Sequence, residues 1–183
     1  MQLKFENHLE GKVKKWFAVR TRYKAEKEVC RQLSRKGIEV YIPLYSVVRQ
    51  YTRKRKVLKL PLINNYVFVR IVREEYIPVL ETANVVHFIR FSQNLISIPE
   101  DEILLLKRIC REDIPVEIAE LAFHTGEEVE IIGGKLTGIR GQLLDTSGKQ
   151  FLVELMYIGI GLRLEIDPKL LSPVNRVIPA YTG

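Results

Sequence analysis

The stretch from Arg53 to Val72, RKRKVLKLPLINNYVFVRIV, constrains the fold of this 183-residue chain more than any other. It opens with four consecutive cations and continues as a nearly apolar run. The β-branched and aromatic residues at 66–71 are typical of a strand. A period of two puts Tyr66, Phe68 and Arg70 on one face and Val67, Val69 and Ile71 on the other. Because both faces are mostly apolar, we expect a central strand that is covered on both sides.

Positive charge is concentrated in the first part of the chain. Residues 40–73 contain eight Lys or Arg and no Asp or Glu. Residues 1–111 carry a net charge of +12 and residues 124–172 a net charge of −2, within a total of +7 and a pI of about 9.4. This balance favours a polyanionic partner, and its uneven distribution favours two domains with different partners.

The order of predicted elements suggests the fold of the first part. Strands are predicted at 16–21, 40–48, 66–71 and 85–91, and helices at 24–36, 74–83 and 99–111. In the first helix Ala25, Val29 and Leu33 recur every four residues, and Gly37 follows as a natural C-terminal cap. The first six elements follow the split βαβ order. We therefore expect an α+β protein whose first domain is a ferredoxin-like α/β sandwich.

The sequence changes in texture from Gly126 onwards. Short apolar runs at 129–131, 142–144, 151–155 and 162–166 are separated by glycine-rich segments, which predicts a small SH3-like β-barrel. The predicted organisation is a flexible N-terminus at 1–14, a first domain at 15–111, an acidic linker at 112–124, a barrel domain at 125–175 and a tail at 176–183.

The sequence contains no catalytic constellation. The histidines at positions 8, 87 and 124 lack metal-ligand spacing, and Cys30 and Cys110 carry no signature of a nucleophile. The string Gly133–Lys135 lacks the first glycine and the Ser or Thr of a phosphate-binding loop. We expect a protein that is not an enzyme and that uses no cofactor and no metal.

Localisation is predicted from what the chain does not contain. Two cysteines make no disulfide framework, the N-terminus has no apolar signal-peptide core, and no stretch reaches the length of a membrane span. We therefore expect a cytoplasmic protein that does not associate with a membrane.

The cations at 53–56 have two interpretations. Runs of charge are usually solvated surface, and these four residues fit that interpretation. Contact with a nucleic-acid backbone is the alternative, favoured by the acid-free span, by Tyr51 beside the cations and by a basic stripe of Lys27, Arg31 and Arg35 on the first helix.

Several segments resemble the NusG family of transcription factors. Residues 15–21, KWFAVRT, resemble the opening strand of the NusG amino-terminal domain, and residues 61–69, PLINNYVFV, resemble its signature strand. Residues 85–91, VVHFIRF, are similar to the matching strand of the specialised paralogue RfaH. The segment from Gly126 through Gly134 to Gly141 resembles a KOW motif. Together the resemblance covers residues 15–172.

This resemblance implies a transcription elongation and antitermination factor. Family members bind RNA polymerase through an apolar cavity of the first domain, which grips the clamp helices of the largest subunit, and they suppress pausing or termination. Their KOW domain recruits a second factor, such as Rho or a ribosomal protein. The chain is similar to the specialised RfaH-like or UpxY-like group, which serves long operons for surface polysaccharides. We expect a monomer that also contacts DNA or RNA of the elongation complex.

The residue pattern and the resemblance together suggest three sets of site residues. Polymerase binding is assigned to Trp16, Ile63, Tyr66, Phe68 and Phe88. Nucleic-acid binding is assigned to Arg22, Lys24, Arg53, Lys54, Arg55 and Lys56. Binding of the KOW partner is assigned to Tyr157, Ile158 and Ile160, with Gly126, Gly134 and Gly141 as turn glycines.

The chain also departs from the family pattern. Asn64 stands where the family has a proline before the signature tyrosine, and Lys135 replaces the proline of the KOW turn. Residues 74–83 do not match the polar motif with which RfaH reads DNA, so we transfer no sequence specificity. One rival is a ribosome-associated or general RNA-binding KOW protein. The other is a ferredoxin-like enzyme, which would need convergent titratable groups in a pocket.

Overall fold

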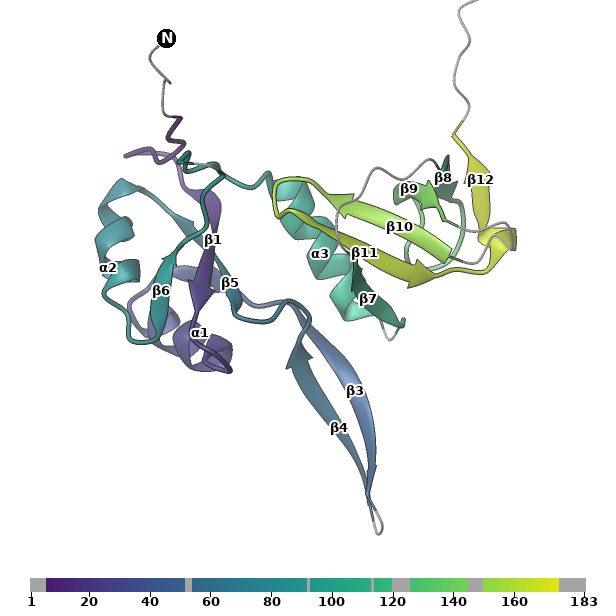
Figure 1. Ribbon diagram of the computed structural model, residues 1–183, viewed down its shortest axis with the longest axis horizontal. Coiled ribbons are helices and arrows are strands. Elements are labelled where there is room, and N and C mark those ends of the chain that lie inside the picture. Colours follow the sequence, from purple (N-terminus) through teal and green to yellow (C-terminus); the bar gives the residue numbers. More distant parts are fainter. Residues whose placement is uncertain are drawn as a thin grey trace, which may run out of the picture. The chain divides into compact units, whose positions relative to one another are not determined.

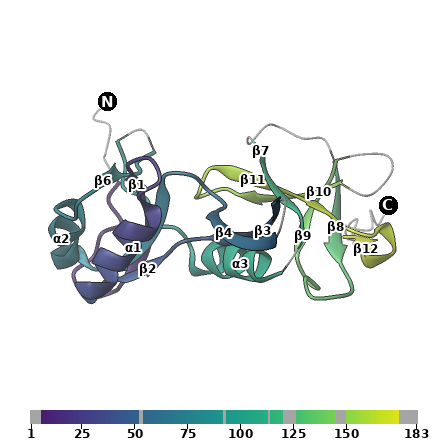
Figure 2. The same ribbon diagram turned by 90° about the horizontal axis from the view of Figure 1, so that it is seen from below.

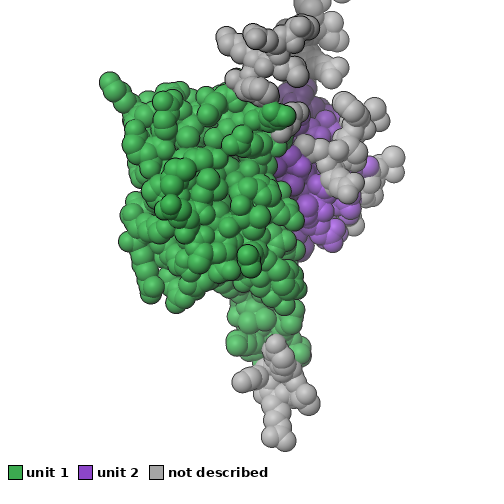
Figure 3. All heavy atoms as spheres, turned by 60° about the vertical axis from the view of Figure 1, so that its left-hand side comes forward, with its two compact units in different colours: residues 1–113 green, residues 114–183 purple. Residues whose placement is uncertain are grey.

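The structure, a computed structural model, describes residues 6–51, 54–91, 93–112, 114–119, 126–144 and 150–174. The chain divides into two compact units, residues 1–113 and residues 114–183, which Figure 3 distinguishes by colour. Both units combine β-sheet with few helices (Figure 1). Within the described ranges, no helix has the length and apolar character needed to cross a bilayer.

The first unit contains a four-stranded antiparallel sheet with the order β2-β5-β1-β6. Its elements are β1 (Lys15–Thr21), α1 (Glu26–Arg35), β2 (Glu39–Tyr41), β3 (Leu44–Tyr51), β4 (Lys54–Pro61), β5 (Tyr66–Ile71), the 3-10 helix η1 (Arg73–Glu75), α2 (Tyr76–Leu80), β6 (Val85–Phe88) and α3 (Glu100–Arg111). Strand β5 lies inside the sheet, between β1 and β2. The prediction of a central strand at this position is therefore confirmed.

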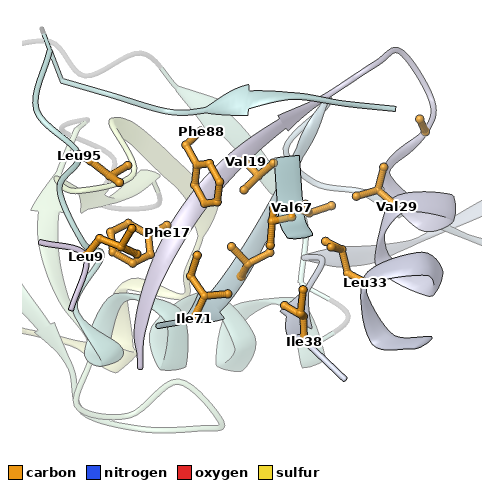
Figure 4. Packing of buried hydrophobic residues seen from close by; sticks show 13 residues of the cluster. Leu9, Phe17, Val19, Val29, Leu33, Ile38, Val67, Ile71, Phe88 and Leu95 are labelled. Carbon is orange, nitrogen blue, oxygen red and sulfur yellow. The ribbon is translucent and has the colours of Figure 1, made fainter. Parts of the chain in front are cut away.

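One face of this sheet carries the core that it shares with α1 and α2. A cluster of buried side chains includes Phe17 and Val19 from β1, Val67 from β5, and Val29 and Leu33 from α1 (Figure 4). Each of these five side chains is 0% exposed. The predicted four-residue repeat in α1 therefore marks the face that packs on the sheet.

Helix α1 ends as the sequence predicts. Gly37 adopts a left-handed φ of +75°, and its N–H donates to the carbonyl oxygen of Ser34. The N–H of Ile38 donates to the carbonyl oxygen of Leu33. These two bonds form a Schellman motif, and the buried side chains of Ile38 and Leu33 supply the apolar contact that accompanies it.

The N-terminal segment was predicted as a flexible terminus at 1–14. The N–H of His8 donates to the carbonyl oxygen of Leu95, and the N–H of Leu95 donates to the carbonyl oxygen of Glu6. The N–H of Arg73 donates to the carbonyl oxygen of Glu10. Leu9 is buried in the sheet core (Figure 4). Leu9 gives residues 6–10 an apolar anchor that their polar sequence does not indicate, and the flexibility of the terminus stays a prediction.

The predicted strand at 40–48 is split into two strands that belong to different sheets. β2 ends at Tyr41, β3 begins at Leu44, and Pro43 lies between them. Proline has no N–H to donate to a strand partner, and here its carbonyl oxygen accepts from the N–H of Leu62. β2 therefore stays in the four-stranded sheet while β3 pairs with β4.

The predicted cationic loop at 53–56 is also corrected. Lys54 begins β4, and β3 and β4 form a two-stranded antiparallel hairpin that extends away from the four-stranded sheet (Figure 1). The register pairs Arg49 with Lys56 and Gln50 with Arg55. The cations were assigned to a loop because they interrupt the apolar pattern, yet a solvated two-stranded ribbon tolerates charge on both of its faces.

The helix predicted at 74–83 is shorter and has two parts. A 3-10 turn at Arg73–Glu75 leads into α2, which ends at Leu80. Pro78 is the third residue of α2, where its missing N–H costs no helical hydrogen bond. The side chain of Glu75 accepts from the N–H of Val72 at 3.0 Å and so ties the start of the turn to its end.

The second unit is a six-stranded sheet with the order β12-β8-β9-β10-β11-β7 (Figure 2). Its elements are β7 (Val116–Ala119), β8 (Glu127–Ile131), β9 (Arg140–Leu143), β10 (Gln150–Leu155), β11 (Ile160–Glu165), the 3-10 helix η2 (Pro168–Leu170) and β12 (Leu171–Pro173). β7 lies inside the range that was predicted as linker. Its residues Val116 and Ile118 are paired with β11. The second unit therefore begins before the predicted boundary at 125.

Two of the three predicted turn glycines are not in turns. Gly134 lies in a turn with a φ of +76°, which favours glycine. Gly141 lies within β9, and a Cβ there would be 2.2 Å from the carbonyl oxygen of Leu152 on β10. Gly126 precedes β8, where a Cβ would be 2.4 Å from the carbonyl oxygen of Leu143. At these two positions glycine is needed for close approach between backbones rather than for a turn.

Candidate functional site

The second face of the four-stranded sheet carries most of the predicted polymerase-binding residues. The register places Trp16 opposite Arg70 and Arg20 opposite Tyr66, so these side chains share a face with Phe68. Trp16 is 2% exposed and Phe68 is 0% exposed. The ring of Phe68 stacks on Tyr41 of β2, with 6.2 Å between the centroids. Trp16 and Phe68 are therefore buried and do not contribute to an exposed patch.

Helix α3 covers part of this face. The indole Nε1 of Trp16 donates to Oε2 of Glu100 at 2.9 Å, and the same carboxylate lies 3.4 Å from the guanidinium of Arg70. Nζ of Lys107 lies 5.0 Å from the Trp16 ring centroid and 5.3 Å from that of Tyr41. These contacts fix α3 against the sheet and explain why Trp16 is inaccessible.

The face remains open where β1, β5 and β6 present Arg20, Tyr66 and His87. Arg20 and His87 are exposed, Tyr66 is half-buried, and the Arg20 guanidinium carbon lies 5.9 Å from the centroid of the Tyr66 ring. His87 lies directly opposite Arg20 on β6. The sequence prediction found Tyr66 but missed the two polar neighbours, which only the strand register reveals.

Phe88 and Ile63 do not join this open area. Phe88 belongs to the core on the opposite face, where its ring stacks on Tyr76 with 4.5 Å between the centroids and meets Phe17 edge-on. Ile63 is buried in the connection before β5. Tyr66 is thus the member of the predicted polymerase-binding set with an accessible ring.

The connection before Tyr66 is held by a buried carboxylate. Glu26, at the start of α1, is 3% exposed, and its Oε1 accepts from the N–H of Asn65 at 2.7 Å. Asn65 has a φ of +64°, a conformation that asparagine tolerates better than most residues. Helix α1 therefore fixes the backbone from which the Tyr66 side chain projects.

The predicted nucleic-acid-binding cations lie on two segments of the first unit. Arg22 and Lys24 are exposed in the connection between β1 and α1. Tyr23 between them is 76% exposed, and Nζ of Lys24 lies 4.9 Å from its ring centroid. An exposed aromatic ring among cations suits base stacking, and the sequence prediction missed it.

The other cations lie on the hairpin. Arg55 and Lys56 are exposed on opposite faces of β4; Arg53 and the side chain of Lys54 lie outside the described part of the structure. Nζ of Lys27 on α1 donates to the carbonyl oxygen of Lys59 on β4, which brings the start of α1 beside the hairpin. The contact joins α1 to the base of the hairpin, whereas Arg55 and Lys56 lie toward the other end of β4.

In the second unit the predicted partner-binding residues occupy the β10–β11 turn. Tyr157 is 45% exposed, Ile160 is half-buried, and Ile158 is 7% exposed and packs inside. Met156, which the prediction omitted, is 62% exposed beside Tyr157. The accessible apolar surface of this turn is therefore Met156 and Tyr157.

A family model described as "Transcription termination factor nusG" matches residues 14–107, just over half of the chain. The chain belongs to the NusG family. The matched range includes β1, β5 and the hairpin between β2 and β5, the segments that carry the open sheet face and the cations. The identification places the chain in a family of transcription factors and confirms the resemblance at this level.

Solved structures are also similar to this member of the NusG family. The structure of Thermotoga maritima NusG is 21% identical with a TM-score of 0.51, and the match covers 88% of this chain and 98% of that one. A chain of the MjSpt4:Spt5 complex is 18% identical, with coverage of 88% and 99% and a TM-score of 0.31. Curated protein sequences gave no match. The first of these structures supports a shared fold.

Proposed function

We propose that this member of the NusG family is a transcription elongation and antitermination factor that binds RNA polymerase through the open sheet face around Tyr66. One observation carries the proposal: the strand that resembles the family signature projects a half-buried tyrosine beside exposed Arg20, and exposed His87 lies on the other side of Arg20. An aromatic ring with a polar rim is the composition of a binding hot spot. The clamp helices of the largest polymerase subunit are the proposed partner.

The arrangement of the sheets supports the finer reading of the fold. The sheet order β2-β5-β1-β6, with α1 and α2 on the face that carries the core, is the order expected for a ferredoxin-like domain. Six short antiparallel strands with close backbone approach at Gly126 and Gly141 suit an SH3-like KOW domain. We assign the second partner, such as Rho or a ribosomal protein, to Met156 and Tyr157 of this domain.

The exposed cations support a second contact, with DNA or RNA of the elongation complex. Arg22, Lys24 and Arg55 are exposed on two segments of the first unit, and Tyr23 offers a ring for stacking. Such contacts would be independent of sequence and sensitive to salt. The basic charge of the first unit and the short connection to the second favour a specialised RfaH-like or UpxY-like member.

The polymerase assignment is tested with Tyr66→Ala in the full chain, using a pull-down with purified RNA polymerase. Loss of a hot-spot aromatic costs about 2 kcal/mol or more, which is roughly a thirtyfold loss of affinity. Tyr23→Ala is the matched control, because it removes an exposed tyrosine of the same unit that lies outside the strands of the sheet. If Tyr66→Ala is folded and binds polymerase as well as the control does, the assignment of this face is wrong.

A further inference from the structure

A pocket of about 460 Å³ opens in the first unit where the base of the hairpin meets the C-terminal half of α3. Figure 2 shows α3 beside β3 and β4. The residues that give the pocket its chemistry are Tyr41 from β2, Ser46 from β3, Lys59 from β4, and Lys107, Cys110 and Arg111 from α3. It lies apart from the open face at Tyr66, because α3 covers the sheet between them.

Three cations converge on this pocket. Lys59 comes from the hairpin, whereas Lys107 and Arg111 are four residues apart on α3 and therefore share a helix face. No Asp or Glu is among the described residues that line the pocket. The ammonium of Lys107 is held at the wall by the two aromatic rings that it contacts, so one of the three charges is already positioned.

The remaining titratable groups of the pocket are neutral. Burial raises the pKa of the Tyr41 hydroxyl and that of the Cys110 thiol above their ordinary values. Near neutral pH, neither group offsets the positive charge. The exposed hydroxyl of Ser46 can donate a hydrogen bond to an anionic oxygen. The pocket is therefore built for an anion.

The hairpin extends this cationic surface away from the pocket. Period-two alternation places Lys59, Val57 and Arg55 on one face of β4. The cross-strand pair Val48 and Val57, 47% and 61% exposed, lies on this face between the two cations. A cation, an exposed apolar pair and a second cation follow one another along the ribbon.

We propose that this pocket binds a backbone phosphate of a single-stranded nucleic acid whose chain continues along the Lys59–Arg55 face of the hairpin. Phosphates would meet the cations, and bases or sugars would lie on Val48 and Val57. An acidic protein segment would fill the pocket equally well but would not need the alternation of charge and apolar surface beyond it. The proposal rests on the proposed function for its nucleic-acid contact and adds Lys59, Lys107 and Arg111 to it.

The test is the double variant Lys59→Gln/Arg111→Gln, which removes two exposed cations of the pocket and leaves Lys107 on its rings. Binding of a labelled single-stranded DNA of mixed sequence is measured by fluorescence anisotropy over a series of salt concentrations. The control, Lys12→Gln/Arg90→Gln, removes the same charge from exposed positions elsewhere in the first unit. Far-ultraviolet circular dichroism and the emission of Trp16 verify that both variants are folded.

Each lost phosphate contact lowers the slope of log affinity against log salt by about 0.7 on a single strand, so two lost contacts lower it by about 1.4. If the affinity extrapolated to about 1 M salt is unchanged, binding at about 0.1 M weakens roughly 25-fold. The control variant should keep most of its slope. A pocket variant whose slope equals that of the control overturns the proposal.

Two further measurements separate this inference from its alternatives. The first measures binding of a labelled oligoglutamate peptide to the unaltered protein and to the pocket variant. If the pocket variant loses affinity for this peptide but keeps its affinity for single-stranded DNA, the pocket belongs to an acidic protein segment and the proposal is overturned. The polymerase pull-down is repeated with the same variant. Loss of DNA binding with polymerase binding retained supports the pocket, and absence of polymerase binding by the unaltered protein refutes the proposed function without affecting the DNA result.

Discussion

The four-stranded sheet and the β3–β4 hairpin are both antiparallel ribbons of the first unit, but they differ in what surrounds them. β5 has a hydrogen-bonded strand on each side, and four of its six side chains are 0% exposed. The hairpin has one ladder, and exposed valines and cations lie along it. Packed side chains hold the four-stranded sheet in position, whereas the hairpin is held only at its base.

This difference separates stability from binding. Most residues of the signature-like strand are needed to fill the core, so few of them are available to a partner. The hairpin residues fill no core, so their charge can be used for binding without a cost to folding. The comparison predicts large losses of stability from changes in the sheet and small ones from changes in the hairpin.

The largest effect is expected for Phe68→Ala. The Phe68 side chain is 0% exposed and stacks on Tyr41, so its removal should lower the free energy of unfolding by about 3–5 kcal/mol. Urea unfolding followed by the emission of Trp16 measures this, because Trp16 is the one tryptophan in the chain and lies in the first unit.

Phe91→Ala provides the matched control for this experiment. Phe91 is 39% exposed and lies outside the named strands, so its truncation should cost much less than that of Phe68. Equal losses for the two phenylalanines would contradict the view that the sheet carries the stability of this unit.

An intermediate effect is expected for Glu26→Ala. The buried carboxylate accepts from the N–H of Asn65, and its removal leaves that N–H without this acceptor, at a cost of about 1–3 kcal/mol. Glu26→Gln retains a side-chain oxygen and should recover part of the loss in the same unfolding experiment. If Gln is as damaging as Ala, the negative charge and not the hydrogen bond is what matters.

The smallest effect on stability is expected for Arg55→Ser/Lys56→Ser. Both side chains are exposed, so the free energy of unfolding should change by less than about 0.5 kcal/mol. Binding to single-stranded DNA should weaken, with the salt slope reduced by about 0.7 for each lost phosphate contact. A salt slope that does not change would identify these two residues as solvated surface.

The sequence predicts the elements whose pattern is set by burial. Val67, Val69 and Ile71 alternate because they fill the core, and the helix at 26–35 repeats every four residues for the same reason. The start of β4 was predicted as part of a cationic loop, because the run of charges in this exposed part of the hairpin interrupts the apolar pattern. β7 was predicted as linker because its four residues are too few for a clear period.

The site was harder to predict because it depends on contacts between distant segments. The strand register brings Arg20 and His87 to Tyr66, and Lys59 meets Lys107 and Arg111 only through the docking of α3. Phe88 was placed with Phe68 on the resemblance to the family, although the register puts the two side chains on opposite faces. The side chains assigned to the polymerase site remain a prediction until Tyr66 is tested.

The two-stranded form of the hairpin affects whether copies of this protein associate with one another. Among the described residues β3 and β4 pair only with each other, so each offers an outer edge of backbone donors and acceptors to which another chain could add a strand. Arg49 and Lys56 form a cross-strand pair of like charge, and Arg55 lies beside them. Such charge repels a second copy from either edge, so the same cations that suit a nucleic acid also protect the ribbon from self-association.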